Sequence, residues 1–166
     1  MPNESTVSMA KDIRKFAIIQ LVITVVFLAL IFWMSGGTDA DYPPIWLIVG
    51  LMAAIGIAAF FCERVWLTTP ALDPAADPIE NHKAALDIFT GQTVRKLIIS
   101  ETPLLLAVLS CFVFNRGGWP VLIAALPGLA VMAWEIYPHL RNTSRTAVIL
   151  DSKGVDSRLV DNFLDA

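Results

Sequence analysis

Hydrophobic residues in this chain gather into long runs instead of alternating with polar residues. Four such runs cover Phe16–Met34, Ile45–Cys62, Leu97–Phe114 and Pro120–Tyr137. Each is close to the ~20 residues that a helix needs to cross a hydrocarbon layer of roughly 30 Å. The runs are apolar on all sides, whereas a helix at the surface of a soluble domain keeps a polar face. The pattern therefore predicts four transmembrane helices.

Two short polar connections indicate how these helices are arranged. Residues 35–44 and 115–118 leave little room for structure, and short connections make neighbouring helices antiparallel. We therefore expect an all-α, polytopic membrane protein with one four-helix bundle over residues 16–137. Its helices are expected at about 16–34, 45–62, 92–114 and 120–137, between a segment at 1–15 and a tail at 138–166.

The longest connection, residues 63–91, carries the signals of a further short helix. Three prolines recur every four residues from Pro70 and predict a stiff, extended stretch. Asp77 is then a suitable N-cap, with Glu80 as its capping-box partner. The predicted helix, Pro78–Thr90, either lies along the inner membrane interface before the third transmembrane helix or is a plain connector in the cytosol.

Both ends of the chain are polar but patterned. Residues 1–10 are expected to be disordered, and residues 9–15 could extend the first helix. In the tail, an apolar patch lies at Ala147–Leu150, and Asp156 or Ser157 could cap a last short helix. That helix would carry its apolar residues on one side: Leu159, Val160, Phe163 and Leu164. Such a tail would dock onto the bundle or a partner, and a free, disordered end is the alternative.

Composition supports a membrane protein and excludes other classes. The chain is 56% hydrophobic and 16% charged, with a mean hydropathy of +0.65. Soluble domains hold about 25% charged residues. The net charge of −3 gives no general attraction to nucleic acid. We expect no large extramembrane domain.

The distribution of Lys and Arg predicts the orientation in the membrane. All of them except Arg116 lie before the first run, between the second and third runs, or after the fourth. Because positive residues near helix ends stay on the cytoplasmic side, both termini and the 63–95 loop are expected in the cytoplasm. The chain is thus expected to be a multi-pass protein of the plasma (inner) membrane. The tryptophans fall at helix ends, as in aromatic belts: Trp33, Trp46, Trp66, Trp119 and Trp134.

Two further features of the runs concern processing and cysteine chemistry. The first run is longer than the apolar part of a signal peptide, and Ser35–Gly37 matches a cleavage site poorly, so we expect no cleavage. Cys62 and Cys111 are expected near opposite membrane faces. They should therefore not pair with each other, and a packing role is favoured.

Small residues recur at four-residue spacing in two of the runs. They are Gly50, Ala54 and Ala58 in the second run, and Ala124 and Gly128 in the fourth. This spacing lets helix backbones approach closely in lipid. We expect these residues to pack helices within the bundle, and pairing with another subunit is the alternative.

Glu101 is the strongest candidate for a functional residue, because it lies inside the third hydrophobic run. An ionisable residue in a transmembrane helix is costly unless it is paired or neutral. Pro103 follows closely and should bend the helix. The carboxyl could serve as a structural latch, handle protons or ions, or contact a partner or lipid headgroup.

Several polar side chains are candidate partners of Glu101. Gln20 and Thr24 in the first run lie at a similar depth, and cations lie at the inner boundary: Arg95, Lys96 and Arg141. Glu135, near the inner end of the fourth run, could join the same cluster with Tyr137 and His139.

The sequence offers no signature of a cofactor or of catalysis. A bis-His haem needs two histidines inside the bundle, whereas His82 and His139 lie at or outside the inner interface. The two His and two Cys form no zinc pattern, and there is no phosphate loop, Ser/His/Asp set or HExxH motif. We expect no cofactor, no metal and no enzymatic activity.

Two stretches resemble known proteins. Residues 92–114, QTVRKLIISETPLLLAVLSCFVF, resemble the carboxylate-bearing helix of ATP synthase rotor subunit c in their polar start, membrane Glu101 and apolar continuation. That resemblance implies proton translocation.

A broader resemblance covers residues 90–166. A transmembrane Glu-x-Pro, a short turn, a fourth helix ending Tyr137-Pro138, and the tail pattern Leu150-Asp151, Gly154 and Ser157-Arg158-Leu159 look like small uncharacterised four-helix membrane proteins of actinobacterial type. Some such proteins are accessory subunits of inner-membrane assemblies, including the respiratory cytochrome bcc–aa3 supercomplex.

Three functions follow as expectations. The first is a non-catalytic accessory subunit of a larger plasma-membrane complex, best the respiratory supercomplex, with membrane lipids and other integral membrane subunits as partners. The second is a small proton- or ion-handling protein centred on Glu101. The third is an assembly or lipid-binding partner of an envelope transporter.

Overall fold

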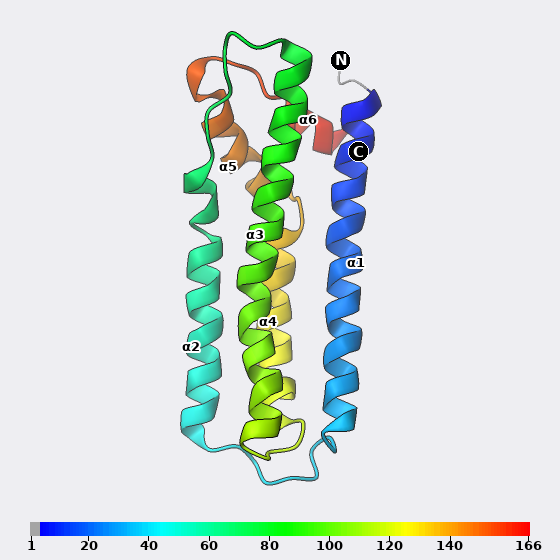
Figure 1. Cartoon of the computed structure of the whole chain (residues 1–166), viewed down its shortest axis with the longest axis vertical. Helices are drawn as coiled ribbons and strands as arrows, with labels where there is room; N and C mark the ends of the chain where they lie inside the picture. Colours follow the sequence, from blue (N-terminus) through cyan, green and yellow to red (C-terminus); the bar gives the residue numbers. More distant parts are fainter. Residues whose placement is uncertain (1–3) are drawn as a thin grey trace.

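The computed structural model describes residues 4–166, which form helices joined by turns and loops and contain no strand (Figure 1). The helices are α1 (Glu4–Met34), α2 (Ile45–Cys62), α3 (Pro78–Val113), α4 (Trp119–Ile136), α5 (Leu140–Leu150) and α6 (Leu159–Leu164), with short 3₁₀ helices η1 (Val65–Thr68) and η2 (Asp151–Lys153). Four of them, α1 to α4, are long and apolar enough to cross a membrane. The predicted all-α bundle of four membrane-spanning helices is confirmed.

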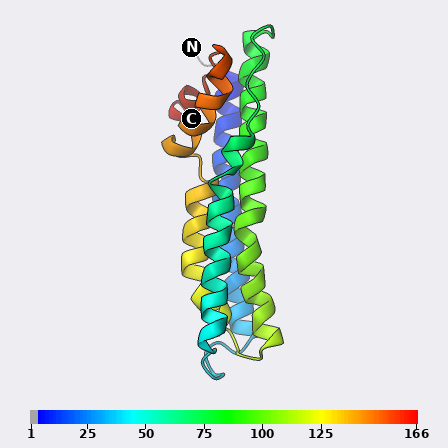
Figure 2. The same cartoon turned by 90° about the vertical axis from the view of Figure 1, so that its left-hand side faces the viewer.

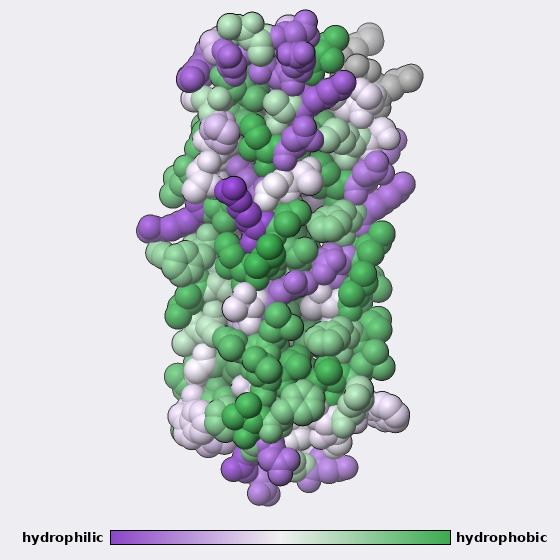
Figure 3. All heavy atoms as spheres, in the orientation of Figure 1, coloured by the Kyte–Doolittle hydropathy of each residue, from purple (hydrophilic) through white to green (hydrophobic). Residues whose placement is uncertain are grey.

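The four long helices run antiparallel to their chain neighbours, with α3 and α4 at the centre of the bundle. Helices α1 and α2 flank this pair on opposite sides, and each packs against both members (Figures 1 and 2). Both chain termini lie at one end, which we call the terminal end, and the 35–44 and 114–118 connections lie at the other, the loop end. On the face shown in Figure 3, apolar side chains form a broad belt, and polar ones gather at both ends.

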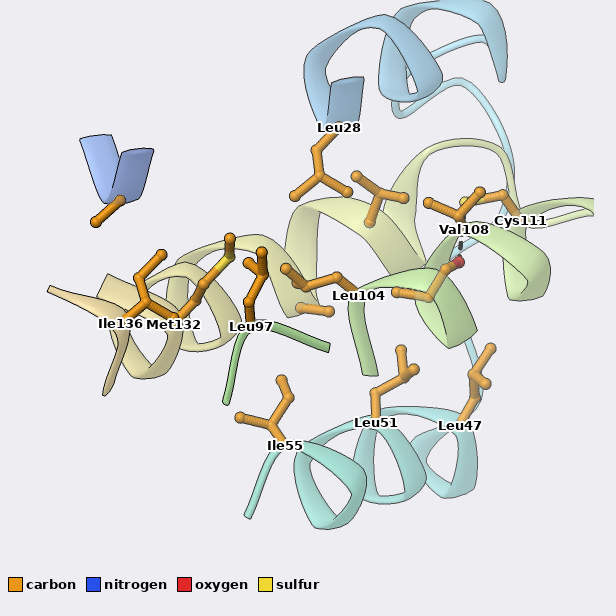
Figure 4. Close-up of a cluster of buried hydrophobic side chains, with 14 residues drawn as sticks. Leu28, Leu47, Leu51, Ile55, Leu97, Leu104, Val108, Cys111, Met132 and Ile136 are labelled. Atoms are coloured by element: carbon orange, nitrogen blue, oxygen red, sulfur yellow. Dashed lines mark hydrogen bonds between the residues drawn. The ribbon is translucent and has the colours of Figure 1, made fainter. Parts of the chain in front are cut away.

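Apolar side chains from all four long helices meet in the core of the belt (Figure 4). Leu28 of α1, Leu51 of α2, Leu104 of α3 and Met132 of α4 are all buried there. The outward faces stay apolar, with Val22, for example, 55% exposed. An apolar exterior around an apolar core is the arrangement that a bilayer requires.

Helix α3 corrects the prediction of a separate interfacial helix. It begins as expected, because Asp77 Oδ1 accepts a hydrogen bond from the Ile79 N–H at 2.7 Å and Pro78 occupies the first turn. It then runs without a break through Gly91 to Val113. Leu86 and Phe89 are buried against other parts of the chain and not turned toward a membrane surface, so packing holds this stretch in line with the membrane-spanning part.

The N-terminal segment also differs from the prediction. Helix α1 already begins at Glu4, so residues 4–10 are helical and not disordered, while residues 1–3 lie outside the described part. Ala10 and Ile13 are buried in the apolar cluster that also holds Leu86 and Phe89. This burial explains why the helix continues past the membrane-spanning run.

A second apolar core forms at the terminal end, in a region that we call the cap (residues 4–15, 65–92 and 138–166). Its largest buried members are Leu86, Phe89, Leu150, Leu159 and Phe163. Parts of the N-terminal segment, the longest connection and the tail, which were predicted to lie outside the bundle, therefore pack into one core. The tail packs onto the rest of the chain, which was one of the two alternatives predicted for it. Its apolar patch Ala147–Leu150 belongs to helix α5, which was not predicted.

The last helix, α6, forms where the sequence pattern predicts one, but its cap differs from the prediction. It begins at Leu159 with Arg158 in the N-cap position, so neither Asp156 nor Ser157 is the N-cap. Both side chains still bind the backbone just before the helix, because Ser157 Oγ accepts from the Leu159 N–H at 3.4 Å and Asp156 Oδ1 accepts from the Arg158 N–H at 3.0 Å. Leu159 and Phe163 are buried in the cap core, and Leu164 is exposed. Arg14 of α1 donates to the carbonyls of Phe163 and Ala166, which fixes the end of the tail to the first helix.

Candidate functional site

The most densely connected polar site lies where the apolar bundle core meets the cap. Lys96 on α3 donates from Nζ to Glu135 Oε2 on α4 at 2.8 Å, and the two side chains are only 9% and 3% exposed. Burying a single charge at this depth would be costly, but two opposite charges in hydrogen-bond contact offset much of that cost. The pair joins the two central helices at one level of the bundle.

Two arginines of α5 extend this pair into what we call the boundary network: Glu63, Lys96, Glu135, Arg141 and Arg145. Arg141 and Arg145 both donate to the Glu63 carboxylate, and Arg141 Nη1 lies 4.0 Å from Glu135 Oε1. The arginines are four residues apart, so they lie on one face of α5. Burial, and then the charge of Arg145, lower the pKa of Arg141. The network ties α5 to α2 and α4.

Neutral side chains complete the junction between bundle and cap. Asn142 Nδ2 donates to the carbonyls of Trp134, Glu135 and Tyr137 at 3.0–3.2 Å. These carbonyls end α4 and have no partner within the helix, so a buried amide here removes a desolvation cost. Gln92 likewise bridges the 63–77 connection and α5, because it donates to Thr69 and accepts from Thr146.

Little space is left around the Lys96–Glu135 pair on the side of α5. The cavity beside Lys96 and Glu135 has a volume of about 10 Å³, which is no more than the space for one water molecule. Among residues 4–166, no group of three or more His, Cys, Asp or Glu side chains could hold a metal ion. The ion pairs of the boundary network can hold the helices together.

Glu101 forms a second, separate polar site between α1 and α3. Its Oε1 accepts from Gln20 Nε2 at 2.9 Å, and Thr24 Oγ1 lies 3.5 Å away while it donates to the Gln20 carbonyl at 2.9 Å. The site opens into a crevice of about 120 Å³ that also contains Phe27 and Leu105. The Glu101 side chain is half-buried, with neutral hydrogen-bond partners only.

The structure thus selects among the partners that the sequence suggested for Glu101. It brings Gln20 and Thr24 to the carboxylate, and it places Lys96 and Arg141 with Glu135 instead. Arg95 is exposed, with no ion pair among the described residues. The prediction that Glu135 and Glu101 could share one polar cluster is therefore wrong.

No protein-family model, curated protein or solved structure matches this chain. The resemblances to rotor subunit c and to respiratory accessory subunits therefore remain hypotheses that rest on the residues that carry them, Glu101 and the pattern over residues 90–166. Any function must be argued from the two polar sites and from the surface of the bundle.

The small residues that were predicted to pack helices lie at different surfaces. Ala124 is fully buried, and a Cβ at Gly128 would lie 2.5 Å from Leu104 Cδ2, so the stripe on α4 lets α3 approach closely. On α2, Ala58 is buried, whereas a Cβ at Gly50 would meet nothing within 4 Å. Gly50 therefore packs no helix of this chain, and Ala54 lines an open groove between α2 and α3.

Other residues of the boundary network were not predicted from the sequence. Glu63 follows α2 as its C-cap, and Arg145 lies in a helix that was not predicted, as does the neighbouring Asn142. A usable signal did exist, because Arg141 and Arg145 have the four-residue spacing of one helix face. The short apolar pattern of α5 is interrupted by polar residues, so the sequence alone did not predict a helix there. Without a predicted helix, the spacing of the two arginines could not be interpreted.

Proposed function

We propose that this chain is a non-catalytic accessory subunit of a larger plasma-membrane complex, and that the respiratory cytochrome bcc–aa3 supercomplex is the first complex to test. The observation that carries the proposal is the boundary network. Lys96 and Glu135 neutralise each other as a buried ion pair, so their charge serves the architecture. A chain whose buried charges hold its helices rigidly together suits a scaffold for neighbouring subunits.

The outward face of α1 supports the same proposal. This helix packs mainly against α3 and α4, with its terminal end on α6, and leaves one long side uncovered (Figure 1). That side presents apolar, mostly β-branched residues between 48% and 56% exposed: Ile18, Ile19, Val22, Ile23, Val25, Val26 and Leu30. β-branched side chains are stiff and lose little rotamer freedom on contact. The face is therefore suited to lipid and to another membrane helix.

Co-purification from native membranes tests the accessory role. A chain tagged at its own locus should recover cytochrome and oxidase subunits in stoichiometric amounts from mild detergent. Val26→Trp, in the outward face of α1, should reduce that recovery several-fold, since a bulky ring separates packed helices. Val49→Trp on the 59%-exposed outer side of α2 is the matched control. Recovery of the chain alone at native abundance would contradict the proposal.

A second candidate function, proton or ion handling, is favoured by the Glu101 site. Within residues 4–166 the carboxyl has only the neutral partners Gln20 and Thr24, and it faces a crevice on the surface that lipid would cover. A carboxyl without a counter-charge in that position is suited to exchanging a proton or cation. Pro103, inside the same helix, removes one backbone hydrogen-bond donor next to it.

Flux measurements in liposomes test this second function. If Glu101 carries protons, a pH gradient should dissipate faster in vesicles that contain the chain than in empty ones. Glu101→Gln should abolish that difference, because an amide cannot release a proton. Glu80→Gln removes an exposed carboxylate of the cap and is the control. Equal leakage with the native chain and with Glu101→Gln would end this candidate.

A further inference from the structure

An open groove runs along the surface between α2 and α3. It has a volume of about 590 Å³, and its lining is almost entirely apolar. On the α2 side, the small side chains of Ala54 and Ala58, one turn apart, line the groove. Pro103 and Leu106 line it on the α3 side. Helix α1 lies on the other side of the α3–α4 pair and does not cover it (Figure 1). Ala54 and Ala58 thus line a cavity at the surface of the bundle.

A cationic side chain closes the terminal end of this groove. Arg64, directly after α2, lines the groove, and its guanidinium carbon lies 4.3 Å from the centroid of the Phe60 ring. Stacking uses the face of the guanidinium and leaves its N–H edges available as donors. Among residues 4–166, Arg64 has no carboxylate within ion-pair distance.

A second cation lies beside the same end. Arg95 precedes Ile99, which lines the groove, by four residues on α3, so both belong to one helix face. Arg95 is exposed, and within the described part of the chain it also lacks an ion pair. Two arginines able to bind an anion therefore flank one end of an apolar channel.

A neighbouring groove provides an internal comparison. The groove between α2 and α4 has a similar volume, about 500 Å³, and is also apolar along Ala59, Val131 and Trp134. Its polar end holds Glu63 and Glu135, whose carboxylates already bind Arg141, Arg145 and Lys96. Of these two grooves, only the one between α2 and α3 combines an apolar channel with unpaired positive charge.

We infer that the α2–α3 groove binds an anionic phospholipid, with an acyl chain along Ala54 and Ala58 and the phosphate at Arg64 and Arg95. From Ala54 to the end of α2 at Cys62 the helix rises about 12 Å, which is long enough for the upper part of an acyl chain. The phosphate would then lie at the end of the membrane-spanning region, where lipid headgroups belong. The inference goes beyond the accessory role and does not depend on any partner subunit.

Native mass spectrometry of the purified full chain tests this site. The chain is equilibrated in mild detergent with equal amounts of phosphatidylglycerol and phosphatidylcholine of identical acyl chains. The native chain should retain the anionic lipid about tenfold more than the zwitterionic one, since each arginine near a headgroup contributes a modest electrostatic attraction. Retention of both lipids in equal amounts would overturn the inference.

Two matched pairs of variants locate the site. The double variant Arg64→Gln/Arg95→Gln should bring the retention ratio close to one, whereas Lys15→Gln, at the same end but on α1, should leave it unchanged. Ala54→Leu fills the groove and should reduce retention of both lipids several-fold, whereas Ala53→Leu, exposed outside the groove, should not. An unchanged ratio in the double variant, or equal retention by Ala54→Leu and Ala53→Leu, would overturn the site.

Discussion

Glu135→Gln is expected to lower the free energy of unfolding by about 3–5 kcal/mol, because it leaves the Lys96 ammonium buried without its counter-charge. Lys96 is 9% exposed and lies 2.8 Å from Glu135 Oε2, and no other carboxylate of the described chain pairs with it. The substitution changes shape very little, so the loss reports the charge itself. The midpoint of thermal unfolding in mild detergent should fall by about 10 °C.

Glu101→Gln is the matched control for this prediction. It makes the same chemical change in the same membrane-spanning bundle, but in the described part of the chain Glu101 has only the neutral partners Gln20 and Thr24. The glutamine keeps an acceptor oxygen for both, so the midpoint should move by little. If Glu135→Gln were no more harmful than Glu101→Gln, the buried pair would contribute nothing to stability.

Removal of both charges separates the cost of an unpaired charge from the value of the pair. The double variant Lys96→Met/Glu135→Leu should recover most of the stability that Glu135→Gln loses, since apolar side chains of similar volume replace buried ion pairs at little cost. Arg141 keeps its Glu63 partner in that variant. Failure to recover would show that the pair also fixes the geometry of α5 on α4.

Gly117→Ala is expected to lower the free energy of unfolding by about 2–4 kcal/mol. Gly117 has a φ of +57°, which costs about 1–2 kcal/mol for a residue with a side chain. A Cβ there would also lie 2.9 Å from the Gly37 carbonyl oxygen and 3.1 Å from Ala40 Cβ, and backbone cannot yield as a flexible side chain does. Thermal unfolding of the full chain in detergent measures the loss.

Gly36→Ala separates the two causes of this effect. Gly36 has a φ of +81°, but a Cβ at this position would meet nothing within 4 Å, so only the conformational cost of about 1–2 kcal/mol applies. The difference between the two variants therefore reports the contact between the connections at the loop end. Equal losses in both would mean that this contact relaxes without cost.

That contact matters because it joins α1 to the rest of the bundle. The Gly118 N–H donates to the Gly37 carbonyl at 2.7 Å, and Trp119 Nε1 donates to the Ala40 carbonyl at 3.1 Å. Arg14 and α6 hold the opposite end of α1. Helix α1 is thus fixed at both ends while its outer side stays uncovered, as the proposed accessory role requires.

The sequence alone determined the features that depend on local physics. The length of each apolar run specified a membrane-spanning helix, and α2 covers the predicted Ile45–Cys62. Asp77 and Pro78 marked the start of α3, because a cap and a first-turn proline act within a few residues. Gln20 and Thr24 could be named as partners of Glu101 because equal depth in the membrane follows from counting residues.

Only the tertiary structure decided the features that depend on how helices are rotated and offset against one another. Whether Arg141 pairs with Glu101 or with Glu63 and Glu135 depends on how α5 lies against α2 and α4, and depth alone cannot resolve it. The continuation of α3 through Gly91 and the formation of α5 depend on burial against the cap core, which distant segments supply. Ala54 and Ala58 of the stripe on α2 line a groove that stays open at the surface, because small residues permit a close helix approach without enforcing one.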